Sequence, residues 1–364
     1  MSYKVTIGIP VYNVAKHIKM TMDTALAQTF PDIEFLVLDD CGTDNSIEIV
    51  REYQENHPRG KDIRILRQPH NMGIGEARNR MIAEAKGDYF YSLDAGDKIF
   101  ENTIALLYQA AVEHKAEIVY GSHERVFVGS NGTSKIEYVY PHRVFTKPDE
   151  YAMYCFTTGV QVMNWNFLIL LDIIRGNNLK LAPVGHGYGE DFTFTVDLST
   201  YITRAVLLPE ITYQYYTEEK DHKKKRKHAM NRTLMDASIA AIAKKKQRTE
   251  LKDKPYYSLL CATLMMYDYS FVRQIIYRRN EAQPRYTDRE IRDIMRHPMT
   301  FGEIVQSRQK VMRNLYYGFF GIWPPRLSVA FLKLFLKMTD ILVLIRKLRK
   351  QKLRMKSVVT STQN

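Results

Sequence analysis

Short apolar runs alternate with amphipathic stretches along the first hundred residues of the chain. The runs are rich in β-branched and aromatic residues, and the stretches between them repeat apolar positions every three or four residues. The predicted strands are Val5–Ile9, Ile33–Leu38, Ile63–Leu66 and Tyr89–Leu93, and the predicted helices are Ala15–Gln28, Asp44–Gln54 and Ile74–Ala85. This succession predicts a buried parallel sheet, with the polar residues that follow its strands gathered at one edge.

The pattern becomes mixed between Ala116 and Tyr216. The predicted strands there are Ile118–Tyr120, Arg125–Val128, Ile136–Tyr140 and Ala205–Leu208, with helical stretches around Tyr151 and Phe192. We expect antiparallel strands to complete an α/β core in this part of the chain. Beyond Glu218 the periodicity is helical and interrupted by prolines, so the sequence predicts two domains, residues 1–218 and a helical region at 219–364.

Composition and charge narrow the class of protein. The 364 residues are 45% hydrophobic and 26% charged, which is typical of a globular protein and excludes disorder as the main state. Residues 1–218 have a net charge of −8 and residues 219–364 a net charge of +21, so the second part favours anionic partners. Three cysteines and an N-terminus without an export signal predict a cytosolic protein.

Two acidic clusters follow two of the predicted strands. Asp39 and Asp40 come directly after one strand, where they can accept hydrogen bonds from ribose hydroxyls or a base edge. Asp94 and Asp97 follow another strand, and their hard oxygen atoms suit Mg²⁺ or Mn²⁺ bridging a diphosphate. Either pair could also consist of solvated turn residues.

Several motifs in order resemble glycosyltransferase family 2, a family of inverting enzymes of the GT-A fold that includes enzymes of bacterial polysaccharide and lipopolysaccharide synthesis. The matching segments, which cover nearly all of residues 4 to 100, are Val5–Asn13, Gln28–Phe30 with Ile33–Glu34, Leu38–Ser46, Asn71–Gly73 with Ala77–Asn79, and Gly87–Asp94. The resemblance implies an α/β GT-A domain that binds a nucleotide-sugar donor, most simply a UDP-sugar.

The resemblance also implies roles for single residues. The residues expected at the donor are Pro10, Tyr12, Asn13, Asp39, Asp40, Arg78 and Asp94. Tyr12 offers a ring for stacking, Asp40 an acceptor for a uracil-type N–H group, and Arg78 a bidentate partner for the diphosphate. The alternative for Arg78 is a surface residue of a helix, paired with Glu76 or Glu84.

One departure from the family pattern concerns the metal. The family commonly shows Asp-x-Asp-Asp after this strand, whereas Gly96 stands at the third position here. We expect Asp94 and Asp97 to share a divalent cation, Mn²⁺ or Mg²⁺, directly or through water. The basic run at 220–227 could neutralise the leaving diphosphate instead.

An acidic pair follows a glycine-rich loop further along the chain. Glu190 and Asp191 resemble the family's acidic pair, which implies that Asp191 is the general base and that Glu190 lies at the acceptor. Trp165 resembles aromatic residues that stack on acceptor sugars, although a buried core tryptophan is an equal alternative. Acidic residues are also common in a first helical turn, and we leave His186 and His222 outside the core site.

The segment from 324 to 354 predicts an amphipathic helix. One face carries Arg326, Lys333 and Lys337, and the other is wide and apolar, with charges too frequent for a membrane-spanning segment. We expect this helix to bind an anionic membrane surface peripherally, on the cytosolic side. The alternative is a helix packed on the globular body or in a dimer interface.

Together these features predict an inverting glycosyltransferase that extends a glycan acceptor, most plausibly a lipid-linked one. The competing prediction is a non-catalytic nucleotide- or glycan-binding protein of the GT-A fold that associates with membranes. No nucleic-acid-binding signature supports a nucleic-acid partner. The sequence leaves the sugar, the linkage and the oligomeric state open.

Overall fold

The computed structural model describes residues 3–129, 132–158, 163–182, 189–218, 231–278, 284–307 and 310–339. The chain divides into two compact units. The first unit contains Met1–Ala229, Thr233–Lys245 and Glu250–Tyr257, and the second contains Met230–Arg232, Lys246–Thr249 and Ser258–Asn364. This division differs from the expected boundary after residue 218, because residues 233–245 and 250–257 group with the first unit.

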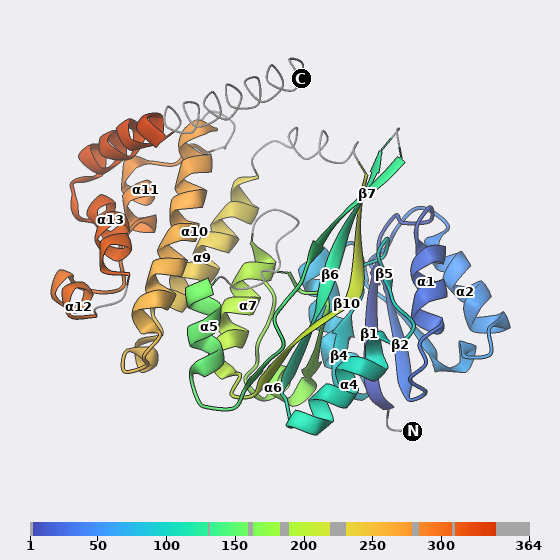
Figure 1. Ribbon diagram of the computed structural model, residues 1–364. Helices are drawn as coiled ribbons and strands as arrows, with labels where there is room; N and C mark the ends of the chain where they lie inside the picture. Colours follow the sequence, from blue (N-terminus) through green and yellow to red (C-terminus); the bar gives the residue numbers. More distant parts are fainter. Residues whose placement is uncertain are drawn as a thin grey trace, which may run out of the picture. The chain divides into compact units, whose positions relative to one another are not determined.

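One mixed sheet forms the centre of the first unit (Figure 1). Its strands are β1 (Tyr3–Val11), β2 (Ile33–Asp39), β3 (Ile63–Arg67), β4 (Gly87–Ser92), β5 (Lys98–Ile99), β6 (Ile118–Gly129), β7 (Gly132–Tyr138), β8 (Arg143–Phe145), β9 (Phe167–Leu170) and β10 (Ala205–Glu218). The order is β3-β2-β1-β4-β9-β6-β10-β5, with β7 paired to β6 and β8 to β10. The strands from β3 to β4 are parallel, as the sequence predicts, and β9 joins β4 in antiparallel register.

Helices cover both faces of this sheet, which explains why its central strands are apolar on both sides. They are α1 (Ile18–Leu26), α2 (Ser46–Asn56), α3 (Ile74–Glu84), α4 (Thr103–His114), α5 (Glu150–Thr158), α6 (Leu171–Gly176) and α7 (Glu190–Tyr201), with a 3₁₀ turn, η1 (Gly60–Asp62). One core cluster joins the sheet to α1, α2 and α4, and the other joins it to α3, α5, α6 and α7. The predicted α/β fold of the GT-A class is confirmed.

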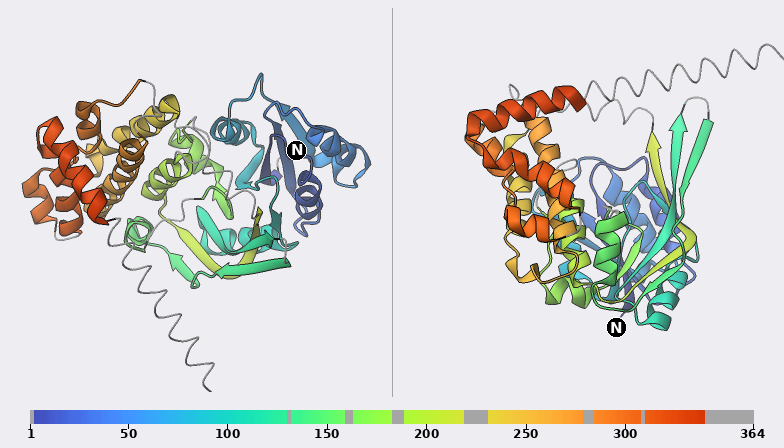
Figure 2. Two further views of the ribbon diagram at one scale, coloured as in Figure 1. Left: turned by 90° about the horizontal axis from the view of Figure 1, so that it is seen from above. Right: turned by 60° about the vertical axis from the view of Figure 1, so that its left-hand side comes forward.

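The strands β6, β7 and β10 form a long ribbon. The two short strands predicted at 118–120 and 125–128 are one continuous strand, β6, which pairs with β10 in parallel and with β7 in antiparallel register. Figure 2 shows β6 and β7 in green beside the yellow-green β10. Because β10 continues past Leu208 to Glu218, it brings Tyr213 and Tyr216 into hydrogen-bonding distance of Asp97, the end of the Asp94–Asp97 turn.

The second unit is helical in its described part. Its helices are α10 (Tyr257–Tyr277), α11 (Asp288–Ile294), α12 (Phe301–Gln306), α13 (Val311–Ile322) and a helix at 325–339. Helix α9 (Arg232–Lys246) and the 3₁₀ turn η2 (Thr249–Leu251) each have residues in both units. Capping boxes begin α11 and α12, in which Thr287 pairs with Glu290 and Thr300 with Glu303. These local signals fix where both short helices start.

The C-terminal helix at 325–339 has one buried face and one exposed face. Val329, Leu332 and Leu336 are buried, so one face of the helix at 325–339 belongs to the folded body. This burial matches the alternative of a packed helix for that face, and residues 340–354 of the predicted helix lie outside the described residues. Among the described residues, no helix is long and apolar enough to cross a membrane.

Candidate active site

The site lies where the parallel strands of the first unit end. Strands β1, β2 and β4 each end on residues that the sequence marks as candidates, and the backbone N–H of Asp40 donates to the carbonyl of Val11 at 2.9 Å. The carboxyl edge of a parallel sheet is the usual ligand site of α/β folds. The structure thus gathers Asp40 and the end of β1 at one edge.

The Asp39–Asp40 pair holds two loops. Asp40 accepts the backbone N–H of Met72 on Oδ1 at 2.8 Å and that of Gly73 on Oδ2 at 3.0 Å. Asp39 accepts the backbone N–H of Cys41 at 2.9 Å. Both carboxylates are buried, so each of them fixes the backbone beside the expected base and ribose site.

Tyr12 and Asn13 lie on the turn after β1. Asn13 adopts a left-handed backbone, and its Oδ1 accepts the N–H groups of Thr43 at 2.7 Å and Asp44 at 3.3 Å. This joins the turn after β1 to the turn after β2. Tyr12 is 47% exposed, so its ring is accessible for stacking, whereas Pro10 is buried in β1.

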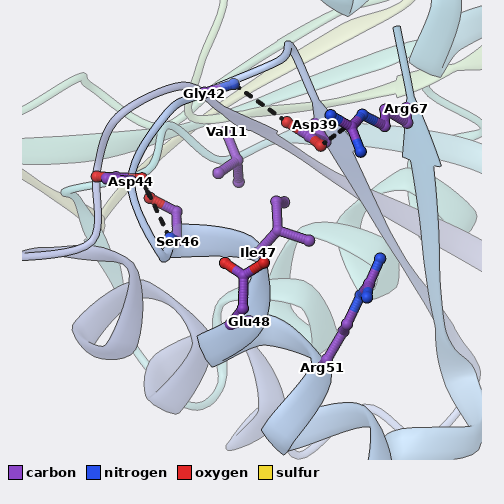
Figure 3. Close-up of a pocket in the computed structure, with 9 residues that line it drawn as sticks. All are labelled: Val11, Asp39, Gly42, Asp44, Ser46, Ile47, Glu48, Arg51 and Arg67. Atoms are coloured by element: carbon purple, nitrogen blue, oxygen red, sulfur yellow. Dashed lines mark hydrogen bonds and ion pairs between the residues drawn. The ribbon is translucent and has the colours of Figure 1, made fainter.

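A small polar pocket lies beside Asp39 at the start of α2 (Figure 3). Its lining residues are Val11, Asp39, Gly42, Asp44, Ser46, Ile47, Glu48, Arg51 and Arg67. Arg67 Nε lies 3.4 Å from the Asp39 carboxylate, and Asp44 caps the turn before the helix by accepting from Ser46. The pocket is polar and adjoins Asp39. The carboxylates of Asp94 and Asp191, which are hydrogen-bonded to Arg78, do not line it.

Arg78 links the ends of two distant segments. Its guanidinium donates to Asp94 Oδ1 at 2.7 Å and to Asp191 Oδ1 at 3.1 Å, and its side chain is almost entirely buried. The alternative pairing with Glu76 or Glu84 is therefore not what the structure shows. Burial lowers the pKa of Arg78, but the two carboxylates outweigh it, so the group stays cationic. Arg78 thus neutralises part of the charge of both carboxylates.

The two acidic residues at the start of α7 are held in a poorly solvated place. Burial raises the pKa of Asp191 to about 6, against the opposing effects of Arg78 and Asn164. Burial and the neighbouring Asp191 raise the pKa of Glu190 to about 7. A carboxylate with a raised pKa is a better proton acceptor near neutral pH than an ordinary one. The cluster has the property that a general base requires.

Asn164 is a member of this cluster that the sequence did not single out. Its Nδ2 donates to Asp191 Oδ1 at 2.7 Å, the same oxygen that Arg78 contacts. Within the described residues, Asp191 Oδ2 therefore has no donor, although the side chain remains 33% exposed. The Oδ1 atom of Asn164 and the Nε atom of Arg78 are buried and have no partner among the described residues. One oxygen of Asp191 is fixed, and the other is open.

Helix α3 also holds the chain that precedes Asp191. The side chain of Asn79 accepts the N–H of Leu181 at 2.8 Å and donates to its carbonyl at 2.9 Å. A Cβ atom on Gly75 would lie 2.3 Å from the carbonyl oxygen of Ala182, so only glycine fits there. The helix that carries Arg78 is thus in close contact with residues 181–182.

Asp97 lies in a buried, hydrogen-bonded position, and its expected role as a metal ligand stays a prediction. Its Oδ2 accepts the Tyr213 hydroxyl at 2.7 Å and its Oδ1 the N–H of Tyr216 at 2.8 Å, and the side chain is buried. Burial and the neighbouring Asp94 raise the pKa of Asp97 well above its usual range. No group of three or more His, Cys, Asp or Glu side chains in the described part of the chain is arranged to hold a metal.

Trp165 lies in the core, as the second of its two expected alternatives describes. Its ring is buried and stacks on Tyr213 and Tyr215 at centroid distances of 4.4 and 5.4 Å, with His123 at its edge. A ring covered in this way packs in the core and does not present a face to an acceptor sugar. Glu190 is also buried, whereas His186, His222 and the basic run at 220–227 lie outside the described residues.

Known proteins resemble this chain in sequence and in fold. The model of glycosyl transferase family 2 matches residues 6–175. The "Uncharacterized glycosyltransferase YibD" of Escherichia coli (strain K12) is 28% identical over 58% of this chain and 61% of its own length. The chondroitin synthase of Pasteurella multocida (strain Pm70) is 36% identical over 30% of this chain and 11% of its own length.

One solved structure shows the same fold. The crystal structure of S. aureus TarS 1-349 in complex with UDP-GlcNAc has a TM-score of 0.65 and 18% identity, and the alignment covers 86% of this chain and 88% of that one. This chain therefore spans most of the TarS fragment, but less than two thirds of the curated relatives named above. The part of the chain that the model of glycosyl transferase family 2 matches, residues 6–175, contains most of β1 and all of β2 to β4, with Asp39, Asp40 and Asp94 at or just after the strand ends, and in this part the chain is similar to that family.

Proposed function

We propose that the chain transfers a sugar, with inversion, from a nucleotide-sugar donor to a hydroxyl group of a glycan acceptor. The observation that carries this proposal is how the Asp191 carboxylate is hydrogen-bonded and how its pKa is shifted. Two donors hold its Oδ1, its Oδ2 is open within the described residues, and its pKa is raised to about 6. A binding protein without chemistry would not require such a carboxylate at the mouth of the site.

The proposed reaction is a substitution at the anomeric carbon of the donor sugar, and it needs no oxidant or reductant. The acceptor oxygen forms a bond to the anomeric carbon of the donor sugar, and its proton passes to Asp191 Oδ2. The bond between that carbon and the diphosphate oxygen breaks, and the nucleoside diphosphate leaves with the electron pair. Arg78 stays cationic through this step and orients Asp191 while the negative charge shifts to the leaving group.

The donor is most simply a UDP-sugar. Tyr12 supplies an exposed ring for the base, and the loop held by Asp40 lies at the same edge of the sheet. The similar TarS fragment is in complex with UDP-GlcNAc, which supports a uridine nucleotide for this fold. We assign Asn13 and Asp39 to the shape of this site, since their hydrogen bonds fix the turns that surround it. We assign Pro10 to the same site from its buried place near the end of β1.

A divalent cation fits this site only with fewer protein ligands than the sequence predicts. Asp97 is occupied by Tyr213 and Tyr216, which leaves Asp94 as the partly exposed carboxylate of the motif. Mg²⁺ commonly binds one protein carboxylate together with substrate phosphates and water, so Asp94 with the diphosphate would hold it. Such an ion, when bound, would neutralise charge on the diphosphate.

The experiment that tests the proposal is a donor screen with purified protein. We expect hydrolysis or transfer from at least one UDP-sugar, and we expect Asp191→Asn to abolish it while UDP still binds. If no nucleotide sugar is consumed although UDP binds with the same affinity in both proteins, the chain is a binding protein and the proposal fails.

The metal is tested separately by titration calorimetry of UDP with Mn²⁺ and with excess chelator. Asp94→Asn should remove the advantage that Mn²⁺ gives to UDP binding. Asp97→Asn should keep that advantage if the variant folds. Equal UDP affinity in Mn²⁺ and in chelator for the unmutated protein would remove the cation from the proposal.

The acceptor is proposed to be lipid-linked, and the protein to act at a membrane surface. The support comes from the basic, partly apolar C-terminal helices, since residues 219–364 have a net charge of +21. A transferase that extends a lipid-linked glycan works where its acceptor is anchored. Transfer to an acceptor on vesicles and to the same glycan in solution would separate this part of the proposal from the chemistry.

A further inference from the structure

Exposed apolar side chains gather on two helices of the second unit. On α13 they are Met312, Phe319 and Ile322, and on the helix at 325–339 they are Leu327, Leu334 and Met338. We call these six residues the apolar ridge. Met312 is 78% and Ile322 74% exposed, which is unusual for large apolar residues of a folded unit.

The ridge residues lie on one stripe of each helix. Positions 312, 319 and 322 fall within about a quarter of the circumference of α13, at roughly 100° per residue. Positions 327, 334 and 338 form a stripe along the second helix, together with the half-buried Phe331. A separate face of that helix carries the buried Val329, Leu332 and Leu336. The ridge is therefore additional to the face that packs in the core.

Aromatic contacts join the two stripes. Phe319 of α13 and Phe331 of the second helix lie 5.6 Å apart between ring centroids, and Trp323 contacts both rings at 5.6 and 5.4 Å. Because Phe319 and Phe331 belong to the exposed stripes of their helices, the two stripes meet at these rings. The apolar ridge therefore runs from one helix to the other across these three rings.

The charges around the ridge have one sign. The sequence from Lys310 to Thr339 contains five basic residues and no acidic residue. Arg326, Lys333 and Lys337 are exposed and lie on a stripe beside the apolar one. An apolar stripe flanked by cations is the pattern of a helix that lies in the interface of an anionic bilayer.

We propose that the apolar ridge inserts into the surface of an anionic lipid bilayer, with Arg326, Lys333 and Lys337 on the headgroups. The proposal rests on the membrane part of the proposed function and extends it to a surface on α13, outside the helix that the sequence predicted. A second copy of the chain fits less well, because a two-fold contact would bring the same cations together without an acidic partner from 310–339.

The test is co-sedimentation of the full chain with vesicles of phosphatidylcholine, with and without phosphatidylglycerol. We expect binding to the anionic vesicles that weakens in high salt without vanishing, because screening does not affect the apolar contact. Met312→Glu combined with Ile322→Glu should lower the vesicle partition coefficient at least ~10-fold. Lys333→Gln combined with Lys337→Gln should lower it several-fold, and only on anionic vesicles.

The matched control is Val112→Glu, since Val112 on α4 of the first unit is also exposed, at 56%. It should leave vesicle binding unchanged. Circular dichroism melting shows whether each variant is folded, and donor hydrolysis in solution shows whether the active site is intact. Hydrolysis without vesicle binding would overturn this proposal and leave the catalytic one standing, whereas vesicle binding without hydrolysis would do the reverse.

Two further results would overturn the proposal. Equal binding by the unmutated protein and the Met312→Glu, Ile322→Glu variant would remove the ridge from any membrane contact. A protein that ignores vesicles and forms a dimer, which the same two substitutions convert to a monomer, would assign the ridge to a contact between copies. Sedimentation equilibrium distinguishes this last case.

Discussion

Two acidic clusters of the first unit, Asp39–Asp40 after strand β2 and Glu190–Asp191 at the start of helix α7, are held differently. Both oxygens of Asp40 accept backbone N–H groups, so that carboxylate fixes a loop and has little left to offer a substrate proton. Asp191 receives both of its donors on one oxygen, and these donors are side chains. The first arrangement builds the walls of a site, and the second presents a reactive atom. Hydrogen-bond partners therefore distinguish the two roles where sequence motifs look alike.

The largest effect should come from Asp191→Asn. The amide keeps the shape of the side chain but cannot accept the acceptor proton, so transfer should fall at least ~100-fold with UDP affinity nearly unchanged. Steady-state kinetics and calorimetry on the same preparation measure both quantities. If the variant retains most of the turnover, Asp191 Oδ2 is not the base. Asp191 would then have no chemical role that separates it from Asp40.

Arg78→Lys should have the next largest effect. An ammonium group cannot donate in a fork to both Asp94 and Asp191, so one carboxylate would lose its partner in a buried site. We expect kcat to fall between about 10- and 100-fold. Arg80→Lys on the same helix is the matched control and should change kcat less than twofold. Similar losses in both variants would show that α3 needs its guanidinium groups in general, and that the bridge from Arg78 to Asp94 and Asp191 is not the cause.

Asn164→Ala removes the second donor to Asp191 Oδ1. The expected result is a ~10-fold lower kcat with a donor KM that changes less than twofold, because the donor-binding loops do not contact Asn164. The lost hydrogen bond also raises the pKa of Asp191, so the acidic limb of the pH profile of kcat should move to higher pH. An unchanged profile would assign Asn164 to packing alone.

Asp40→Asn tests the other cluster. One oxygen and an NH₂ group cannot accept both N–H groups of Met72 and Gly73, so the loop should loosen. We expect the KM for the donor to rise several-fold, with kcat within about twofold of the unmutated protein. A fall in kcat as large as that of Asp191→Asn would place Asp40 in the chemistry and contradict the contrast drawn between the clusters.

Glu190→Gln should give the smallest effect, on stability. The pKa of Glu190 is raised to about 7 in the folded state, so the folded protein binds this proton more tightly than the unfolded chain. The charged form therefore costs stability above pH 7, and that cost disappears as the pH falls below about 4.5. The glutamine variant should be more stable by about 1–3 kcal/mol at pH 8 and equal at pH 4. Urea denaturation at the two pH values measures this difference, and an equal gain at both would exclude titration of Glu190 as its cause.

Local pattern predicted the first half of the sheet well. Strands β1 to β4 and helices α1 to α3 lie within a few residues of their predicted bounds, because each has its own period and its own turn. The pairing of β4 with the short β9 was not predicted, since Phe167–Leu170 carries no signal that tells which strand it joins. Sheet order beyond the parallel part depends on contacts far apart in sequence.

The sequence predicted only part of the site, because the site also depends on contacts between residues far apart in sequence. The structure brings Arg78, Asp94 and Asp191 together. The place of Asp94 after a predicted strand made it a candidate, whereas the family resemblance singled out Arg78 and Asp191. Asn164 gave no signal, because a single amide in a mixed segment has neither a period nor a motif. Asp97 appeared free in the sequence, and only the length of β10 shows that Tyr213 and Tyr216 occupy its oxygens.

Helix α3 contacts both the donor motif and the chain segment that precedes Asp191. It carries Arg78 toward the donor motif, and through Asn79 and Gly75 it is fastened to residues 181–182, nine residues before Asp191. Arg78 on the same helix contacts Asp94 and Asp191, so a displacement of α3 changes both of these contacts at once. A side chain introduced at Gly75 would meet the carbonyl oxygen of Ala182 and force α3 or residue 182 to move, which would disturb the contacts of Arg78 without touching either carboxylate.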